Sequence, residues 1–353
     1  MKPALMIKSV RNLKNAVAIN INHVRGREFI PKATYSLGIE TSSLCNLECR
    51  FCAYVKKQSP KVTMKDAFFM DCVAQALDMG YQHFDLTPCT GDVFMDRGIF
   101  NKLMHMENNP GVKGYSFFTN FTIPKAQDIK RLFELTKLTD IAISIYGYDP
   151  KTFVEITQST EKVYRRLVYN LETFMGEIGR RKFAPHFSVH PGVASLRGRT
   201  SEITRLIERI RKAGFPVKIS KGVYNNWGGY VTNADVLGLP MDIVGTDLIY
   251  KKGACVRLFT TVQIMATGIV NGCSCRDVDA TLRLGDLNET PLRELISSHN
   301  PRYMALIDQQ QNGQFQPICR SCDMYASIYH KSSGYRKNNV ELETLAEFKK
   351  RIG

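Results

Sequence analysis

The sequence has no long apolar run. Nowhere in its 353 residues do about 18 uninterrupted apolar residues occur, the length that a helix needs to span a bilayer. Near the start of the chain, Lys8, Arg11 and Lys14 interrupt each apolar stretch before it reaches the length of a signal-peptide core. We therefore expect a cytoplasmic protein without a membrane span, in a compartment where thiols stay reduced.

Acidic residues are scarce relative to basic ones. Asp and Glu number 33 against 48 Lys and Arg, which gives a formal net charge of +15. This surplus favours an anionic partner without identifying it. Apolar residues form 44% of the chain and charged residues 23%, which excludes a mainly disordered or fibrous protein. A chain of this length folds as one large domain or as two.

Short β-rich runs alternate with helical stretches over residues 35–224. Helix signals separate the runs: Ser201 is a good N-cap, and Thr63 with Asp66 has the spacing of a capping box. This alternation predicts an α/β fold, a partial (β/α)6 barrel with its chemistry at the carboxyl ends of the strands. The six candidate strands begin at Tyr35, His83, Gly114, Asp140, Pro185 and Pro216.

The pattern changes after about residue 230. The run from Thr260 alternates and contains Gly268, which predicts a β-hairpin, and Thr290 with Pro291 predicts the start of a helix. We expect an N-terminal extension (1–34), the barrel (35–230), a small hairpin-plus-helix domain (231–333) and a tail (334–353) that ends in a short helix with a solvated charged face.

Three of the ten cysteines lie in the loop after the first candidate strand. Cys45, Cys49 and Cys52 form a CxxxCxxC pattern, which lets three thiolates converge on one metal centre. A structural zinc site normally closes with a fourth ligand, whereas a [4Fe-4S] cluster held by three cysteines leaves one iron open. With the aromatic Phe51 before the third cysteine, the motif resembles that of the radical S-adenosylmethionine (SAM) family.

The resemblance implies a SAM-binding [4Fe-4S] cluster and further SAM-binding residues at later strand ends. Gly91 and Asp92 resemble a variant of the family's glycine-glutamate motif, with Asp in place of Glu. Thr119 and Asn120 match the end of the family's third strand, and Ser144 matches its fourth. Together with Phe51, these residues are the expected cofactor contacts. In this family, reductive cleavage of SAM gives a radical that removes hydrogen from an unactivated C-H bond.

A second group of cysteines lies in the small domain. Cys255 and Cys273 flank the predicted hairpin, and Cys319 with Cys322 form a CxxC pair. The layout resembles the twitch domain, a shortened relative of the SPASM domain, and implies one auxiliary [4Fe-4S] cluster with Cys275 spare. It is also similar to the layout of a radical SAM dehydrogenase that acts on an aminocyclitol. A zinc ribbon with the same four thiolates is the alternative.

Four residues are candidates for catalysis. Cys275 is a hydrogen-atom donor, an alternative cluster ligand or a loop thiol, and Cys89 lies either at the barrel mouth or in the packing. His186, Ser188 and His190 alternate along one strand and share a face, which the barrel interior can receive. His190, nearer the carboxyl end, is the better placed general base, against the alternative of a structural histidine.

The leading hypothesis is a radical SAM oxidoreductase that acts on a small polar substrate, such as a sugar, cyclitol or nucleotide-linked sugar. Oxidation results if a base takes a proton, and epimerisation results if a thiol returns hydrogen. An electron donor such as flavodoxin or ferredoxin is expected. A radical SAM peptide maturase is a second hypothesis, disfavoured because only about 34 residues precede the first strand. A basic zinc-binding nucleic-acid module is a third, but we find no recognition helix or basic aromatic stripe, so no specific nucleic acid is expected.

Overall fold

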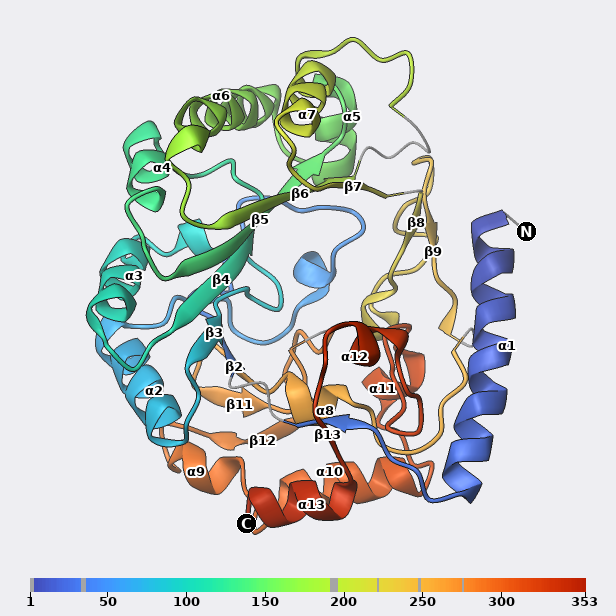
Figure 1. Cartoon of the computed structure of the whole chain (residues 1–353). Helices are drawn as coiled ribbons and strands as arrows, with labels where there is room; N and C mark the ends of the chain where they lie inside the picture. The colour runs from blue at the N-terminus through green and yellow to red at the C-terminus, as the bar shows by residue number, and fades with distance from the viewer. Residues whose placement is uncertain (1–2, 33–35, 191–195, 221, 247–248, 275) are drawn as a thin grey trace.

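The core of the protein is a curved nine-stranded sheet in the order β12-β11-β10-β2-β3-β4-β5-β6-β7 (Figure 1). The computed structural model describes residues 3–32, 36–190, 196–220, 222–246, 249–274 and 276–353, with side chains from residue 12 onward. Strands β2 to β7 pair in parallel and in chain order, which confirms the expected partial barrel. These strands are β2 (Ser36–Ile39), β3 (His83–Asp85), β4 (Gly114–Thr119), β5 (Leu138–Tyr146), β6 (Ala184–His190) and β7 (Val217–Ile219).

Helices cover the outer face of this sheet (Figure 1). On β6, Phe187 and Val189 are buried and alternate with the less buried His186, Ser188 and His190, so one face of the strand packs in the core and the other lines the barrel interior. The helices are α2 (Asp66–Asp78), α3 (Ile99–Asn108), α4 (Ala126–Leu132), α5 (Pro150–Thr157), α6 (Glu161–Glu177) and α7 (Glu202–Lys212).

One of the two predicted helix caps is confirmed. The Ser201 hydroxyl accepts a hydrogen bond from the Thr204 N-H at the start of α7 (3.3 Å). The capping box at Thr63 is wrong, because α2 begins at Asp66 after Lys65. The Thr63 hydroxyl instead lies 3.1 Å from that of Ser42, where the two segments form an isolated β-bridge.

The C-terminal region continues the barrel sheet. Strands β10 and β11 form the expected antiparallel hairpin, and β10 also pairs in parallel with β2. The expected strand from Pro216 is divided, because β7 is followed by a separate β8 that pairs with β9. The elements are β8 (Val223–Tyr224), β9 (Asp242–Ile243), α8 (Arg257–Thr260), β10 (Gln263–Ile264), β11 (Ile269–Asn271), β12 (Arg283–Asp286), α9 (Leu292–Leu295), α10 (Pro301–Gln311) and α11 (Pro317–Ser321).

The two ends of the chain meet. Strand β1 (Ile30–Pro31), which follows helix α1 (Pro3–Val24), pairs with β13 (Leu342–Glu343). Between α11 and α13 (Leu345–Arg351) lies α12 (Ser333–Lys337). Phe348 of α13 is buried against Phe259, with ring centroids 4.7 Å apart. The last residues therefore pack on the C-terminal region, and α13 is the short helix expected at the end of the tail. Among the described residues, no helix is both long and apolar enough to cross a membrane.

Candidate active site

Cys45, Cys49 and Cys52 lie together in the loop beyond the carboxyl end of β2. The Cys52 N-H donates to the Cys49 carbonyl (2.9 Å). Burial raises the pKa of Cys45 to about 12 and that of Cys52 to about 11. The pKa of Cys49 is also raised, by burial first and then by the two neighbouring thiols. Three buried thiols that lie this close together lose their protons together only when a bound cation compensates the negative charge of the thiolates.

The loop that contains Gly91 packs directly on the segment leading into Cys45. Gly91 has φ +136°, and a Cβ placed on it would lie 2.8 Å from the Ser42 carbonyl oxygen and 2.9 Å from that of Leu44. The next residue, Asp92, donates its N-H to the Leu44 carbonyl (2.8 Å). Only glycine fits this close approach between two backbones.

The Asp92 carboxylate is the centre of a buried hydrogen-bond network. It accepts from the Phe94 N-H (3.0 Å), the Thr119 hydroxyl (2.9 Å) and the Asn120 N-H (2.6 Å). Burial raises its pKa to about 6, against the effect of these donors. The Asn120 side chain in turn donates to the Cys45 sulfur (3.8 Å). Hydrogen bonds thus link Asp92, Thr119 and Asn120 to Cys45. The Asp92 carboxylate accepts hydrogen bonds from the protein's own donors.

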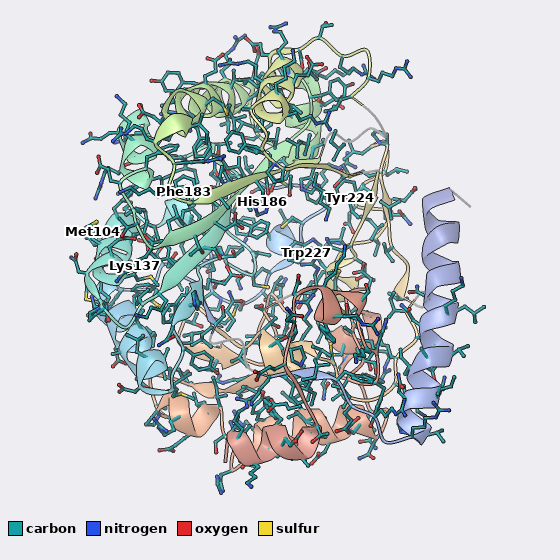
Figure 2. The ribbon with its side chains drawn as sticks, viewed as in Figure 1. Met104, Lys137, Phe183, His186, Tyr224 and Trp227 are labelled. Atoms are coloured by element: carbon teal, nitrogen blue, oxygen red, sulfur yellow. The ribbon has the colours of Figure 1, made fainter. Side chains whose placement is uncertain are left out.

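Phe51 is the centre of a group of four rings at the carboxyl ends of the strands. Its ring centroid lies 5.6 Å from that of Tyr146, 5.6 Å from that of His190 and 5.1 Å from that of Tyr224. The Phe51 carbonyl accepts a hydrogen bond from Trp227 Nε1 (2.9 Å). The rings wall off one side of the cysteine loop, and Figure 2 shows Tyr224 and Trp227 between the barrel and the C-terminal region.

The two histidines predicted as catalytic lie in different places. His190 belongs to the ring group, and burial, aided by the nearby positive charge of Lys218, lowers its pKa to about 4. Its Nδ1 lies 3.0 Å from the Ser220 hydroxyl. His186 lies four positions earlier on β6, where its Nδ1 is 3.0 Å from an Asp140 carboxylate oxygen. The structure therefore brings His190, and not His186, to the first cysteine loop, and both catalytic roles stay predictions.

Ser144, the last expected cofactor contact, lies on β5. Its side chain lies close enough to Tyr146, one of the four rings, to lower the pKa of that phenol slightly. The pKa of Tyr146 is raised well above its usual value, by burial first and then by the charges of the three cysteines. Ser144 thus lies beside Tyr146, which is itself close to the three cysteines, and its expected role as a SAM contact stays a prediction.

Three of the four auxiliary cysteines also lie together. Burial raises the pKa of Cys319, and the neighbouring Cys255 and Cys322 raise it further. Hydrogen bonds to the sulfurs stabilise thiolates and tune iron–sulfur clusters. Each of these sulfurs accepts one such bond: Cys255 from the Ala326 N-H (3.5 Å), Cys319 from Gln310 Nε2 (3.3 Å) and Cys322 from the Met324 N-H (3.2 Å). This donor set fits a cluster bound through cysteine thiolates.

Cys273, the fourth predicted auxiliary ligand, lies just beyond β11, with Gly272 between them. Its carbonyl accepts a hydrogen bond from the buried Asn271 side chain (2.9 Å), which fixes the backbone after the hairpin. Cys275 lies outside the described residues. Cys72, with no exposed surface, belongs to the core of α2, and the nine described cysteines are all free of disulfides.

Two charged residues that the sequence analysis did not single out complete the site. Glu40, fully buried just after β2, accepts from the Cys89 N-H (3.0 Å) and from the Ala266 N-H (3.2 Å). Burial raises its pKa. Cys89 is buried beside it, and burial is also what raises the pKa of that thiol most. The sequence feature that could have identified Glu40 is an acidic residue at the end of an apolar strand, just before the cysteine loop.

Arg276 is the second of these residues. Its guanidinium lies 4.7 Å from the Trp227 ring centroid. Its positive charge lowers the pKa of both Cys52 and Cys89, although burial of each thiol has the larger, opposite effect. Arg276 therefore places a cation near Cys52 of the first cysteine loop and near Cys89. The sequence feature that could have identified Arg276 is its position directly after the segment that contains Cys273 and Cys275.

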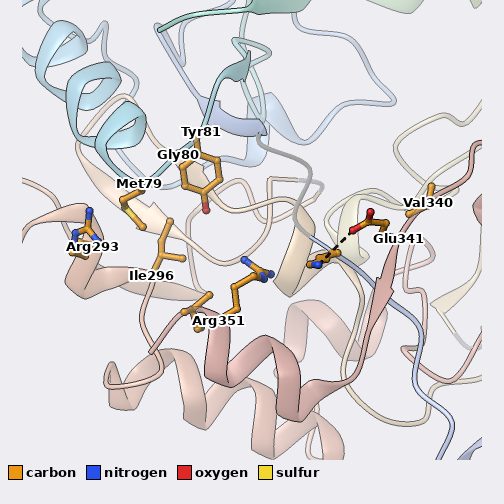
Figure 3. Close-up of a pocket in the computed structure, with 10 residues that line it drawn as sticks. Met79, Gly80, Tyr81, Arg293, Ile296, Val340, Glu341 and Arg351 are labelled. Atoms are coloured by element: carbon orange, nitrogen blue, oxygen red, sulfur yellow. Dashed lines mark ion pairs between the residues drawn. The ribbon is translucent and has the colours of Figure 1, made fainter.

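The described cavities do not coincide with this site. A cavity of 630 Å³ is lined by Tyr81, Arg293, Glu341 and Arg351, among others (Figure 3). Tyr81 precedes β3, so this cavity opens at the amino ends of the strands, opposite the cysteine loop. None of its lining residues is a predicted site residue.

The fold and the cysteine groups have known counterparts. Residues 255–323 match the family model of SPASM, an iron-sulfur cluster-binding domain. The structure is similar to that of BtrN in complex with AdoMet and 2-DOIA, with a TM-score of 0.54 and 13% identity over 85% of this chain and 96% of that one. It is also similar to Streptococcus suis SuiB bound to the precursor peptide SuiA, with a TM-score of 0.52 and 15% identity over 85% of this chain and 73% of that one. No curated protein matches the sequence.

The expected fold is confirmed. The chain shares its partial barrel with these two structures, and the barrel is followed by the region that matches the cluster-binding model. More particularly, the match of residues 255–323 to the SPASM model agrees with the resemblance of the second cysteine group to the SPASM and twitch domains.

Proposed function

We propose that the protein is a radical SAM oxidoreductase with one auxiliary [4Fe-4S] cluster. The observation that carries the proposal is the loop of Cys45, Cys49 and Cys52 at the carboxyl ends of the barrel strands. These three cysteines hold the first cluster, and Cys255, Cys273, Cys319 and Cys322 hold the second. When bound, the first cluster and SAM supply a radical that removes a hydrogen atom from the substrate. Flavodoxin or ferredoxin is the class of electron donor we expect.

The chain's own residues shape the site for SAM. Gly91 brings its loop against the backbone before Cys45, and Asp92 holds Thr119 and Asn120 in place from one buried carboxylate. The ring of Phe51 and the side chain of Ser144 complete the predicted contacts. Because most of these groups are buried, they exclude water from the region where the substrate radical forms.

The substrate we propose is small and polar or anionic, such as a sugar, cyclitol or nucleotide-linked sugar. The Arg276 guanidinium beside Trp227 supplies a cation for an anionic group. His190 has a lowered pKa, so its imidazole is neutral at pH 7, as a proton acceptor must be. Loss of a proton from the substrate radical, with one electron passed to the auxiliary cluster, gives oxidation. Return of a hydrogen atom from a thiol, with Cys89 and Cys275 as the candidates, gives epimerisation and leaves a thiyl radical. One electron from the flavodoxin or ferredoxin and one proton then restore the thiol.

Anaerobic reconstitution tests this proposal. We expect about eight irons per chain, as two four-iron clusters, and release of 5′-deoxyadenosine when SAM and a strong reductant are added. Cys45→Ala should abolish this release. Cys72→Ala is the matched control, because Cys72 is a core thiol in α2 and should leave iron content and release intact. Zinc in place of iron, or no SAM cleavage by the iron-loaded protein, would contradict the proposal.

Peptide maturation is the second candidate function, because SuiB, bound to a precursor peptide, shares the fold. The chain covers 73% of SuiB but 96% of BtrN, which is in complex with 2-DOIA, so the small substrate is favoured. We would add dialysable metabolites or a peptide fraction from the native cell to the reconstituted enzyme. Acceleration of 5′-deoxyadenosine release by the metabolites alone supports the first candidate, and acceleration by the peptides alone supports the second.

A further inference from the structure

Helix α1 stands at the edge of the molecule, alongside the C-terminal half of the chain (Figure 1). One of its faces packs on the protein. Ile19 is buried, and the Asn22 side chain donates to the Tyr329 carbonyl (3.0 Å). The His23 ring meets the Tyr329 ring edge-on, with centroids 4.8 Å apart, and the Tyr250 hydroxyl donates to Asn20 Oδ1 (2.9 Å).

The opposite face of α1 is apolar and exposed. Leu13, Val17, Ile21 and Val24 are 69%, 56%, 46% and 84% exposed. At about 100° per residue, these four positions fall within an arc of about 80°. Ile19 lies about 160° from the middle of that arc. The four side chains, here called the α1 stripe, therefore form a continuous apolar surface that the fold leaves uncovered.

The charge around the α1 stripe has one sign. Residues 1–27 contain no Asp or Glu. Among the described side chains, Lys14, Arg25 and Arg27 are exposed at or beyond the ends of the stripe. In the sequence, six basic residues fall in this segment: Lys2, Lys8, Arg11, Lys14, Arg25 and Arg27. The apolar stripe and the basic charges of this segment are complementary to a partner surface with an apolar interior and an anionic outer layer.

We propose that the α1 stripe docks on an anionic lipid surface. The aliphatic side chains enter the boundary between headgroups and acyl chains, and the flanking Lys and Arg residues bind the lipid phosphates. A second copy of α1 is a poorer occupant, because it would bring basic residues against basic residues. Four side chains also fall short of the roughly 1,200 Å² that stable protein interfaces bury. This inference is independent of the proposed reaction.

Vesicle co-sedimentation tests the proposal on the full-length protein. The probe is vesicles of about three parts phosphatidylcholine to one part phosphatidylglycerol, with pure phosphatidylcholine vesicles for comparison. We expect the protein to bind the mixed vesicles. Its affinity for the neutral vesicles should be lower by about tenfold or more. The variant Leu13→Ser/Val17→Ser/Ile21→Ser should lose about tenfold or more in affinity. Leu237→Ser is the matched control, because Leu237 is 78% exposed and belongs to another surface.

Three results would overturn the proposal. The first is no sedimentation of the wild type with the mixed vesicles at low salt. The second is equal binding by the stripe variant, which would assign vesicle binding to the general basic charge of the chain. The third is a wild-type dimer in light scattering that the stripe variant splits, which would make a second copy the occupant. All substituted side chains are exposed, so unchanged circular dichroism is expected for every variant.

Discussion

Replacement of Gly91 by alanine tests the backbone packing on which the first cysteine loop depends. Gly91 has φ +136°, a conformation that side-chain-bearing residues rarely adopt and that costs about 1–3 kcal/mol. The added Cβ would also lie 2.8 Å from the Ser42 carbonyl oxygen and 2.9 Å from that of Leu44. Both oxygens belong to the backbone and cannot rotate away, so the loop must shift. We expect Gly91→Ala to reduce the free energy of unfolding by about 3 kcal/mol or more.

Two other glycines provide matched controls. Gly80 also has a positive φ (+87°), but no atom lies within 4 Å of an added Cβ. Gly80→Ala should therefore cost only the backbone strain, about 1 kcal/mol. Gly176 lies inside α6 with the same open space and no positive φ, so alanine there should stabilise by about 0.5–1 kcal/mol. Thermal denaturation should rank Gly176→Ala above wild type, then Gly80→Ala, then Gly91→Ala.

The functional effect should follow the same packing. Because the Asp92 N-H donates to the Leu44 carbonyl, a shift of the Gly91 loop moves the segment that enters Cys45. We expect Gly91→Ala to bind SAM about tenfold more weakly, which corresponds to a loss of about 1.4 kcal/mol in binding free energy. Gly80→Ala should bind SAM normally. If Gly91→Ala matched Gly80→Ala in both melting temperature and SAM affinity, the packing argument would be refuted.

Three further predictions concern other parts of the site. Burial lowers the pKa of His190 from 6.5 to about 4, so stability is full above pH 6.5 and declines by up to about 3 kcal/mol as the pH falls through 4. Urea denaturation against pH should show this decline in wild type and not in His190→Phe; identical profiles would contradict it. Trp227→Phe removes the hydrogen bond to the Phe51 carbonyl and should cost about 1–3 kcal/mol in the same assay, whereas an unchanged midpoint would show that water replaces it. Cys319→Ala should lower iron from about eight to about four per chain while SAM binding persists; full iron would exclude Cys319 as a ligand.

The sequence predicted what depends on local patterns. The six parallel strands followed from alternation, and the cysteine layout of the C-terminal region carried the resemblance to the SPASM and twitch domains. Pairings between distant segments had no local signal. The contact of β1 with β13 joins residues about 310 positions apart, and the hydrogen bond of Thr63 with Ser42 replaced a capping box that fitted the sequence equally well. Tertiary contacts decide between such alternatives, and propensity does not.

The histidines of β6 show the same limit within one strand. Period-two alternation placed His186 and His190 on one face, which the structure bears out. Alternation does not say what each residue meets along that face. His186 meets Asp140 of β5, whereas His190 meets the ring of Phe51, which the cysteine loop brings over the end of the strand. The difference between the two environments arises from a loop more than a hundred residues away.

Strand β2 connects the two cysteine groups more directly than the chain does. The first cysteine loop follows β2, and β10 of the SPASM-type domain pairs with β2 in parallel. Just after the strand, the buried Glu40 carboxylate accepts one N-H from Cys89 in the barrel and one from Ala266 in the hairpin. Loss of the Glu40 carboxylate would leave the Cys89 and Ala266 N-H groups buried and unpaired, which is energetically costly. Sheet pairing and one buried carboxylate thus connect the strand before the first cysteine loop to the hairpin between Cys255 and Cys273.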